Sequence, residues 1–395
     1  MKKRTARYIY VLLLSFVLLT SCATTNAFMA REQEVFSTEV SSLEVNVFTT
    51  KYGNLYTAAK GTDLFETGFD WGDIVKVSFL DQELSLPLVP NFSYVDTGVA
   101  AIVVNKTADS LPEGYVLLAV NMGDFTTSYG IATKTTNPDK SFYWTANEGV
   151  TLPLEVTFTM EEKAGYLAEY LIRDLVRTND RADYKSLSDE EFANFRKVTT
   201  TGISNLYRTS NPVNAELGRN TYADKAIEDA GVTVILNLSD SKEEAQARAE
   251  FKGSYYSTCK VTYLNLGVDF SSVDFQSGLA QGLKFMAENK GIYAVHCTEG
   301  KDRAGFVSAL LECLMGASAE EVAADYMATY YNYYGVEKGT EKYNAILSSN
   351  IVKTFQTAFG VNDFWTADLE KGAENYLKTI GLTSSEINTL KANLK

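Results

Sequence analysis

The chain has 395 residues, a length that predicts two domains, each large enough to bury a core. Its formal net charge is −14, and a surface this acidic repels nucleic acid, which argues against a broad role in binding DNA or RNA. The sequence contains a single histidine, His296, so a metal site with several histidine ligands is excluded, and we expect no metal or other cofactor.

The N-terminus has the pattern of an export signal. Basic residues precede an apolar run from Tyr8 to Leu19, which is short for a membrane span. The run ends in Leu19-Thr20-Ser21-Cys22, which resembles the bacterial lipoprotein signal, whose cysteine is acylated and becomes the first mature residue. The resemblance implies a signal peptide at 1–22, lipidation of Cys22 and a protein exported and anchored to the bacterial cell membrane or envelope. An ordinary signal peptide with an incidental cysteine is the alternative, and the polar residues 23–37 predict a tether.

Residues 38–160 have the pattern of an all-β domain, either a sandwich or a barrel. Short β-rich segments such as Leu43–Thr49, Ile74–Phe79 and Val116–Val120 are separated by turn signals that include Pro112-Glu113-Gly114. The order of three motifs, GNLYTAA, WGDIVKVSF and VNMGDFTTSYGIA, is similar to the β-barrel domain of the S-adenosylmethionine hydroxide adenosyltransferases. This resemblance implies a fold and no activity, because the adenosyl chemistry needs a partner domain that the sequence lacks.

Residues 161–395 predict an α/β domain with a central mixed or parallel sheet flanked by helices, followed by C-terminal helices. A helical pattern over 160–178 comes first. After it, short apolar strands alternate with helical segments; the strands are Thr233–Leu238, Val261–Leu266 and Ile292–Val295, and the helices include Phe275–Asn289 and Ala304–Met315.

The stretch around Cys297 predicts an anion-binding loop. A strand ends at His296-Cys297, five residues follow, and Arg303 leads into a helix. The loop N–H groups and the helix N-terminus would converge on one phosphate, held by Thr298, Glu299, Gly300, Lys301, Asp302 and Arg303. The guanidinium of Arg303 can bind two phosphate oxygens, and this positive environment favours the nucleophilic thiolate of Cys297.

Two other kinds of site do not fit this loop. Lys301 is followed by Asp302 rather than by Ser or Thr, which excludes a Walker loop. His296 is adjacent to Cys297 on a predicted strand, so its side chain would point away from the thiol, which excludes a papain-type pair. We expect His296 to support the loop through a hydrogen bond instead.

The form HCTEGKDRAG resembles the signature of the bacterial cysteine-dependent tyrosine, dual-specificity and lipid phosphatases. The similarity extends to Leu206–Pro212 and Val234–Asp240 and covers about residues 195–335. It implies metal-independent hydrolysis of phosphomonoesters through a cysteinyl-phosphate, with Cys297 as the nucleophile and Arg303 as the phosphate ligand. A phosphorylated protein or a small phosphomonoester would be the partner. Phosphotyrosine is the favoured substrate, and phosphoinositides or inositol phosphates are the alternatives.

The sequence offers three candidates for the general acid. Asp269 is favoured because it follows a predicted strand and precedes a helix, the place where the resemblance puts an acid. Asp302 and Asp274 remain alternatives. Arg208 either pairs with a carboxylate or reaches the site, and Lys301 is expected to add positive charge at its mouth.

The residue after Arg303 departs from the family pattern. Ala304 stands where the family usually has a Ser or Thr that helps release the thiolate, so the phospho-enzyme would break down slowly unless Ser308 takes that role. A weakly catalytic lipoprotein that binds phosphorylated ligands is therefore the alternative class of function. The aromatic run Tyr330–Tyr334 is expected to pack in the core rather than to line a pocket.

Overall fold

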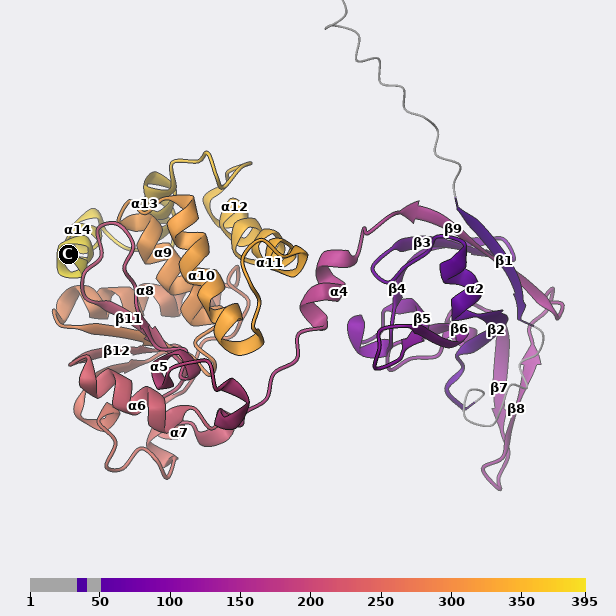
Figure 1. The fold of residues 1–395 in the computed structure, drawn as a ribbon, viewed down its shortest axis with the longest axis horizontal. Helices are drawn as coiled ribbons and strands as arrows, with labels where there is room; N and C mark the ends of the chain where they lie inside the picture. The colour runs from indigo at the N-terminus through magenta and orange to yellow at the C-terminus, as the bar shows by residue number, and fades with distance from the viewer. Residues whose placement is uncertain (1–33, 41–50) are drawn as a thin grey trace, which may run out of the picture.

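The computed structural model describes residues 34–40 and 51–395, which form a strand-rich N-terminal body and an α/β body (Figure 1). The predicted signal peptide with Cys22 and the predicted strand Leu43–Thr49 lie outside the described residues. No helix in the described part of the chain combines the length and the apolar character needed to cross a bilayer.

The N-terminal body is built on one seven-stranded sheet with the order β1-β9-β3-β4-β5-β6-β2. Its neighbouring strands are antiparallel except for β4 and β5, and the edge strands β1 and β2 also contact each other. A separate hairpin pairs β7 with β8. The strands are β1 (Val35–Val40), β2 (Leu55–Lys60), β3 (Ile74–Phe79), β4 (Gln82–Val89), β5 (Ala100–Lys106), β6 (Pro112–Val120), β7 (Ala132–Thr136), β8 (Phe142–Ala146) and β9 (Leu154–Glu162).

Two sequence predictions in this region are wrong. Pro112-Glu113-Gly114, predicted as a turn, begins strand β6, where a register shift in the β5–β6 pairing accommodates the positive φ of Gly114. The helix predicted over 160–178 is much shorter, because β9 continues to Glu162 in its pairing with β3 and α4 covers only Leu167–Arg173. Strand pairing therefore overrides the helical spacing.

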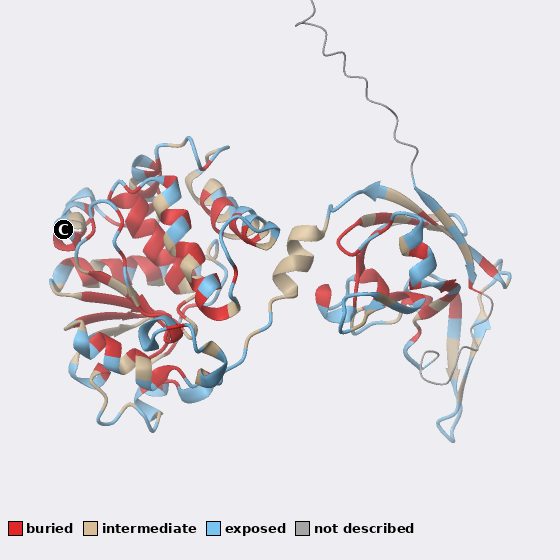
Figure 2. Cartoon of the chain, in the orientation of Figure 1, coloured by how far each residue is buried: buried red, intermediate tan, exposed pale blue. Residues whose placement is uncertain are grey.

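Helix α4 joins the two bodies. It packs between the short 3₁₀ turn η1 (Phe92–Tyr94) and helix α11 (Glu341–Leu347), and its residues are only partly buried (Figure 2). Asp174, which caps α4, accepts hydrogen bonds from Lys106 Nζ at 2.7 Å and Tyr94 Oη at 2.6 Å. On the other side Lys342 Nζ of α11 lies 3.7 Å from the same carboxylate. The carboxylate thus contacts cations from both bodies.

The α/β body has a five-stranded mixed sheet with the order β10-β11-β14-β12-β13, in which only the edge strand β10 is antiparallel. The strands are β10 (Arg196–Lys197), β11 (Leu206–Thr209), β12 (Val234–Asn237), β13 (Lys260–Tyr263) and β14 (Tyr293–His296). All four residues of β14 are buried, as expected for a central parallel strand covered on both faces. The predicted sheet flanked by helices is confirmed.

Helices cover both faces of this sheet (Figure 1). One face carries α6 (Asn220–Asp229) and α7 (Lys242–Ala247). The other carries the larger core, built with α8 (Val273–Glu288), α9 (Asp302–Leu314), α10 (Ala319–Tyr334), α13 (Leu369–Thr379) and α14 (Ser384–Leu394). Helix α11 continues through a π-helical segment, η5 (Ser348–Val352), into α12 (Lys353–Phe359), which packs against α13. Helix α9 begins at Asp302, two residues before the predicted start, so part of the motif lies in its first turn.

Candidate active site

The predicted anion-binding loop lies between the central strand β14 and helix α9. Cys297 follows β14 directly and is only 3% exposed. Gly300 has a φ of +68°, and a Cβ atom there would lie 2.3 Å from the carbonyl oxygen of Thr209 at the end of β11. The loop therefore needs glycine at this position both for its conformation and for its close approach to the sheet.

His296 supports the loop from inside the sheet. Its ring is fully buried, with Nδ1 3.3 Å from the carbonyl oxygen of Cys297 and Nε2 3.2 Å from Tyr256 Oη. Burial lowers the pKa of His296 to about 4, so the imidazole is neutral at physiological pH. The structure thus places the ring against the loop backbone.

Arg208 pairs with a carboxylate rather than facing the ligand side of the loop. It is fully buried, and its Nη1 donates to Asp325 Oδ2 at 2.7 Å. Its Nη2 donates to the carbonyl oxygens of Gly300 at 2.9 Å and Lys301 at 3.3 Å. Burial raises the pKa of Asp325, but the adjacent Arg196 and Arg208 outweigh it and hold that pKa at about 2. The ion pair therefore fixes two loop carbonyls.

The remaining loop carbonyls are held in the same way. Asn194 Nδ2 donates to the carbonyl oxygens of Glu299 at 3.1 Å and Gly300 at 3.2 Å. Tyr333 Oη donates to the Glu299 carbonyl at 2.7 Å, and the Asn211 N–H donates to that of Thr298 at 3.2 Å. The carbonyls of Thr298, Glu299, Gly300 and Lys301 all accept hydrogen bonds from the protein body. Because the peptide is planar and trans, the N–H groups that follow these carbonyls point to the opposite side.

Lys301, which the sequence predicts to add positive charge at the mouth of the loop, is paired with carboxylates in the structure. Its Nζ lies 3.0 Å from Glu299 Oε2 and 3.8 Å from Asp302 Oδ2, and it donates to Tyr334 Oη at 3.3 Å. Glu299 also pairs with Arg177. The side chain of Glu299 is thus engaged by two cations, so its contribution to a phosphate site would come from its backbone N–H.

The guanidinium of Arg303 connects the loop to the segment after β13. Nη1 donates to the carbonyl oxygen of Leu266 at 2.8 Å, and Nη2 donates to Thr298 Oγ1 at 3.2 Å. Nε is buried and has no hydrogen-bond partner within the described part of the chain. Arg303 therefore holds Leu266, which follows β13, beside the loop.

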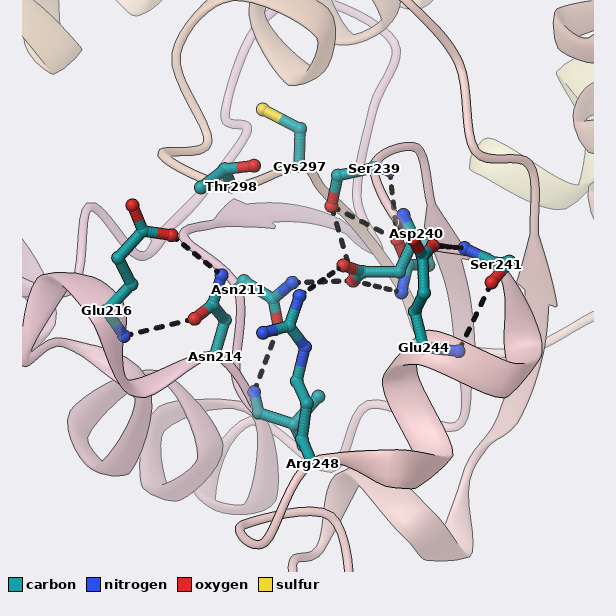
Figure 3. Close-up of polar contacts among 12 residues, drawn as sticks. Asn211, Asn214, Glu216, Ser239, Asp240, Ser241, Glu244, Arg248, Cys297 and Thr298 are labelled. Atoms are coloured by element: carbon teal, nitrogen blue, oxygen red, sulfur yellow. Dashed lines mark hydrogen bonds and ion pairs between the residues drawn. The ribbon is translucent and has the colours of Figure 1, made fainter.

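A second polar network lies next to the loop (Figure 3). Asp240 accepts hydrogen bonds from Asn211 at 2.7 Å, Asn237 at 2.9 Å and Arg248 at 2.7 Å. The side chain of Cys297 points away from this network (Figure 3), so Asp240 is not placed to exchange a proton with the thiol. Instead, its bond to Asn211 positions the residue whose backbone holds Thr298.

The three candidate acids differ in their surroundings. Asp269 is exposed, and hydrogen bonds from the Ser271 hydroxyl at 2.6 Å and N–H at 3.0 Å lower its pKa. Asp274 is exposed in the first turn of α8. Asp302 begins α9 directly after the loop, and desolvation raises its pKa. The side chain of Asp302 is still 47% exposed, so burial alone does not separate it from the other two. Asp302 is favoured because it adjoins the loop at the start of α9 and because its pKa is raised, as an acid that must donate a proton near neutral pH requires.

Several residues of the site carried no sequence signal. Asn194 and Asp325 lie far from the motif in sequence, and no pattern singles them out. Asp240 ends the segment Val234–Asp240, whose similarity to the phosphatases was the one signal that could have pointed to it. Tyr333, predicted to pack in the core, is buried and also bonds the loop, and its ring lies 4.1 Å from the guanidinium of Arg219.

Ser308 lies one helical turn after Ala304. It is fully buried, and its Oγ has no hydrogen-bond partner among the residues the structure describes. Within residues 34–40 and 51–395, no group of three or more His, Cys, Asp or Glu side chains is arranged to hold a metal ion.

A model of the tyrosine phosphatase family matches residues 174–395, more than half of the chain and the whole region that builds this site. The chain belongs to the tyrosine phosphatase family. A tyrosine-protein phosphatase from Nostoc commune is 23% identical over 223 residues, which cover 46% of this chain and 72% of that protein. We therefore describe the protein as a phosphatase, a hydrolase.

Two solved structures are similar to this phosphatase at low identity. The core catalytic domain of the PP-IP phosphatase SIW14 from S. cerevisiae, in complex with citrate, is 16% identical with a TM-score of 0.27; the match covers 42% of this chain and 91% of that one. Human DUSP28 is 14% identical with a TM-score of 0.20, over 46% of this chain and 94% of that one.

Gly300→Ala tests the geometry of the loop. We expect phosphatase activity to fall by at least about 100-fold, because the new methyl group must displace Thr209 and shift the loop. Gly335→Ala is the matched control, since Gly335 has a φ of +65° but no atom within 4 Å of its ideal Cβ. It should lower the free energy of unfolding by only about 1–2 kcal/mol and leave activity intact. Equal activity of the two variants would contradict the geometry.

The single histidine gives a direct test of the buried ring. In the folded protein the one imidazole NMR signal should not titrate between pH 8 and about pH 5, because burial favours the neutral form. The unfolded chain binds this proton near pH 6.5, so the histidine should lower the free energy of unfolding as the pH falls from about 6.5 towards 4. A folded-state midpoint near 6.5 would show that the ring is solvated.

Proposed function

We propose that this phosphatase hydrolyses phosphomonoesters through a cysteinyl-phosphate, with phosphotyrosine as the preferred substrate. The observation that carries the proposal is the orientation of the loop peptides. Four consecutive carbonyls, from Thr298 to Lys301, are bonded to the protein body, so the N–H groups of the next residues face the space beside Cys297. Converging N–H groups at the start of a helix bind a phosphate dianion.

The first step transfers the phosphoryl group to the enzyme. The Cys297 thiolate attacks phosphorus while the bond between phosphorus and the ester oxygen breaks. Loop N–H groups and Arg303 stabilise the equatorial oxygens, and Asp302 donates a proton to the leaving oxygen. The buried Nε of Arg303, without a partner in the described residues, supports its role as a phosphate ligand.

The second step hydrolyses the cysteinyl-phosphate. Water attacks phosphorus, Asp302 accepts the proton from that water, and the sulfur–phosphorus bond breaks to release inorganic phosphate and the Cys297 thiolate. Ala304 offers no hydroxyl to stabilise the departing thiolate. Ser308, whose hydroxyl is buried one turn away, is the residue we propose for this role.

The distribution of charge supports the order of substrates. Lys301 is paired with Glu299 and Asp302, and the chain as a whole has a net charge of −14. One phosphate monoester needs only the loop and Arg303, whereas a fully phosphorylated inositol needs a broad basic rim. We therefore propose phosphotyrosine first, phosphoinositides second and inositol polyphosphates third.

Substitution of the nucleophile tests the proposed reaction. Cys297→Ser should abolish release of phosphate from a phosphotyrosyl peptide while keeping its binding, because backbone groups and Arg303 form the cradle. Arg303→Lys should also lose activity, since an ammonium cannot bind two oxygens in one plane. Activity of Cys297→Ser close to that of the wild type would refute a cysteinyl-phosphate.

The choice of acid has its own test. Asp302→Asn should lower kcat by about 10²–10⁴ for a phosphate ester with a poor leaving group and much less for p-nitrophenyl phosphate, which needs little protonation. Asp269→Asn, in an exposed position, is the matched control and should change neither rate strongly. The opposite pattern would make Asp269 the acid, as the sequence alone suggested.

We also propose that the chain is exported and anchored by acylation of Cys22, as the lipoprotein-like signal implies. Metabolic labelling with a palmitate analogue should label the wild type and not Cys22→Ala, and fractionation should find only the wild type with membranes. An unlabelled wild type would refute the anchor.

A further inference from the structure

A hollow lies beside Asp302, on the side of the loop where the acid stands. It has a volume of about 310 Å³, and its lining includes Val268, Phe270, Asp302 and Tyr326. A second hollow of about 780 Å³ lies between α12 and α13. The two share Phe270, Phe306, Ser349 and Thr354 in their linings. The two hollows are therefore adjacent, and together they are here named the α12–α13 cleft, which has Asp302 at one end.

The position of the acid determines which part of a substrate can enter this cleft. A general acid must lie within hydrogen-bond reach of the leaving oxygen, so the organic group on that oxygen starts beside Asp302. The α12–α13 cleft begins at the same carboxylate. This step rests on the proposed function, because it takes Asp302 as the acid.

The floor of the cleft is aromatic. Phe270 stacks on Phe306 with ring centroids 4.6 Å apart. Phe306 stacks in turn at 5.2 Å on Phe355, which is fully buried beneath the floor and lines neither hollow. Tyr376 packs edge-on against Phe306 at 6.0 Å. Phe359 and Tyr376 extend this surface along the larger hollow. Such a surface binds an apolar side chain of a ligand.

The rim is polar but almost uncharged. Ser271, Gln276, Thr357 and Asn375 line the larger hollow, and Lys353 is the only charged residue among the described residues that line it. Amide and hydroxyl side chains can pair with the N–H and C=O groups of an extended peptide. An acyl chain would leave these groups without partners, and an inositol polyphosphate would need more cations than Lys353.

The wall nearest Asp302 has an irregular backbone. Ser349 and Asn350 lie in the π-helical segment η5, and Asn350 Nδ2 donates to Tyr330 Oη at 2.7 Å. A π-helical turn is rare and weaker than an α-helical one, and such turns are frequent at functional sites. Here three residues of the π-helical segment, Ser349, Asn350 and Ile351, line the hollow beside Asp302.

We propose that the α12–α13 cleft is a specificity site that binds the peptide segment next to phosphotyrosine, with a large apolar side chain on its aromatic floor. The acidic charge of the chain, −14, disfavours acidic flanking residues and adds to the selection for neutral, apolar ones. The cleft thus defines the substrate class as phosphotyrosyl proteins with an apolar residue near the phosphorylated position.

The test compares phosphotyrosyl peptides that differ at the flanking positions in carrying Leu, Ala or Glu. Affinity is measured with Cys297→Ser, and kcat/KM with the active enzyme. The Leu peptides should be favoured over the Ala peptides by about 10-fold or more, the value expected for burying one apolar side chain. The Glu peptides should be the poorest.

Asn375→Trp, on the exposed rim of the cleft, should remove this preference while leaving turnover of p-nitrophenyl phosphate unchanged. Lys371→Trp, exposed one turn earlier on α13 and outside the cleft lining, is the matched control and should keep the preference. Each substitution is introduced both alone and together with Cys297→Ser.

The outcomes separate the proposal of a specificity site from the proposed reaction through a cysteinyl-phosphate. Equal affinity of the Leu and Ala peptides, or a preference that survives in Asn375→Trp, overturns the specificity site. A larger effect of Asn375→Trp on a single-chain acyl phosphate than on the peptides also overturns it in favour of a lipid. Peptide binding with the expected preference but no turnover of any ester leaves the cleft assignment standing and refutes the proposed reaction instead.

Discussion

The site depends on the hydrogen bonds that hold the carbonyl groups of the phosphate loop outward. Arg208, Asn194, Tyr333 and the backbone of Asn211 bind four consecutive carbonyls, and peptide planarity then turns the following N–H groups to the ligand side. Arg208 can serve this purpose in a dry interior because Asp325 compensates its charge. Without these partners, nothing would orient the loop peptides so that their N–H groups converge on one phosphate.

Burial and ion pairing around the loop leave the supporting residues without a free charge or an exchangeable proton. His296 is buried and neutral, so it orders the backbone and exchanges no proton at physiological pH. Lys301 and Glu299 neutralise each other at the mouth. The positive charge left for a substrate is that of Arg303 together with the loop N–H groups, which suits one phosphate and a largely neutral remainder. The uncharged rim of the α12–α13 cleft has the same character.

The two bodies are joined through α4, which makes both apolar and polar contacts. Asp174 receives Lys106 and Tyr94 from the N-terminal body and faces Lys342 on α11. Helix α11 continues through η5 into α12, and these segments line the cleft beside Asp302. Through α4, the N-terminal body is therefore linked to α11, the helix that leads into the η5 and α12 wall of the cleft, although the N-terminal body contributes no residue to the lining of either hollow.

The sequence by itself determined the phosphate loop, the strand and helix on either side of it, and the alternation that makes the mixed sheet. These features are local: a strand, a glycine and an arginine at fixed spacing specify their own geometry. Tertiary structure decided which aspartate is placed as the acid, which side chains bind the loop carbonyls, and where the α12–α13 cleft lies. The sequence offers both Asp269 and Asp302 as acids, and only the packing around Asp302 raises its pKa by partial desolvation, while Asp269 stays exposed. Asp325 and Asn194 lie more than twenty residues from the loop, and no local pattern records which buried carbonyl a distant side chain will satisfy.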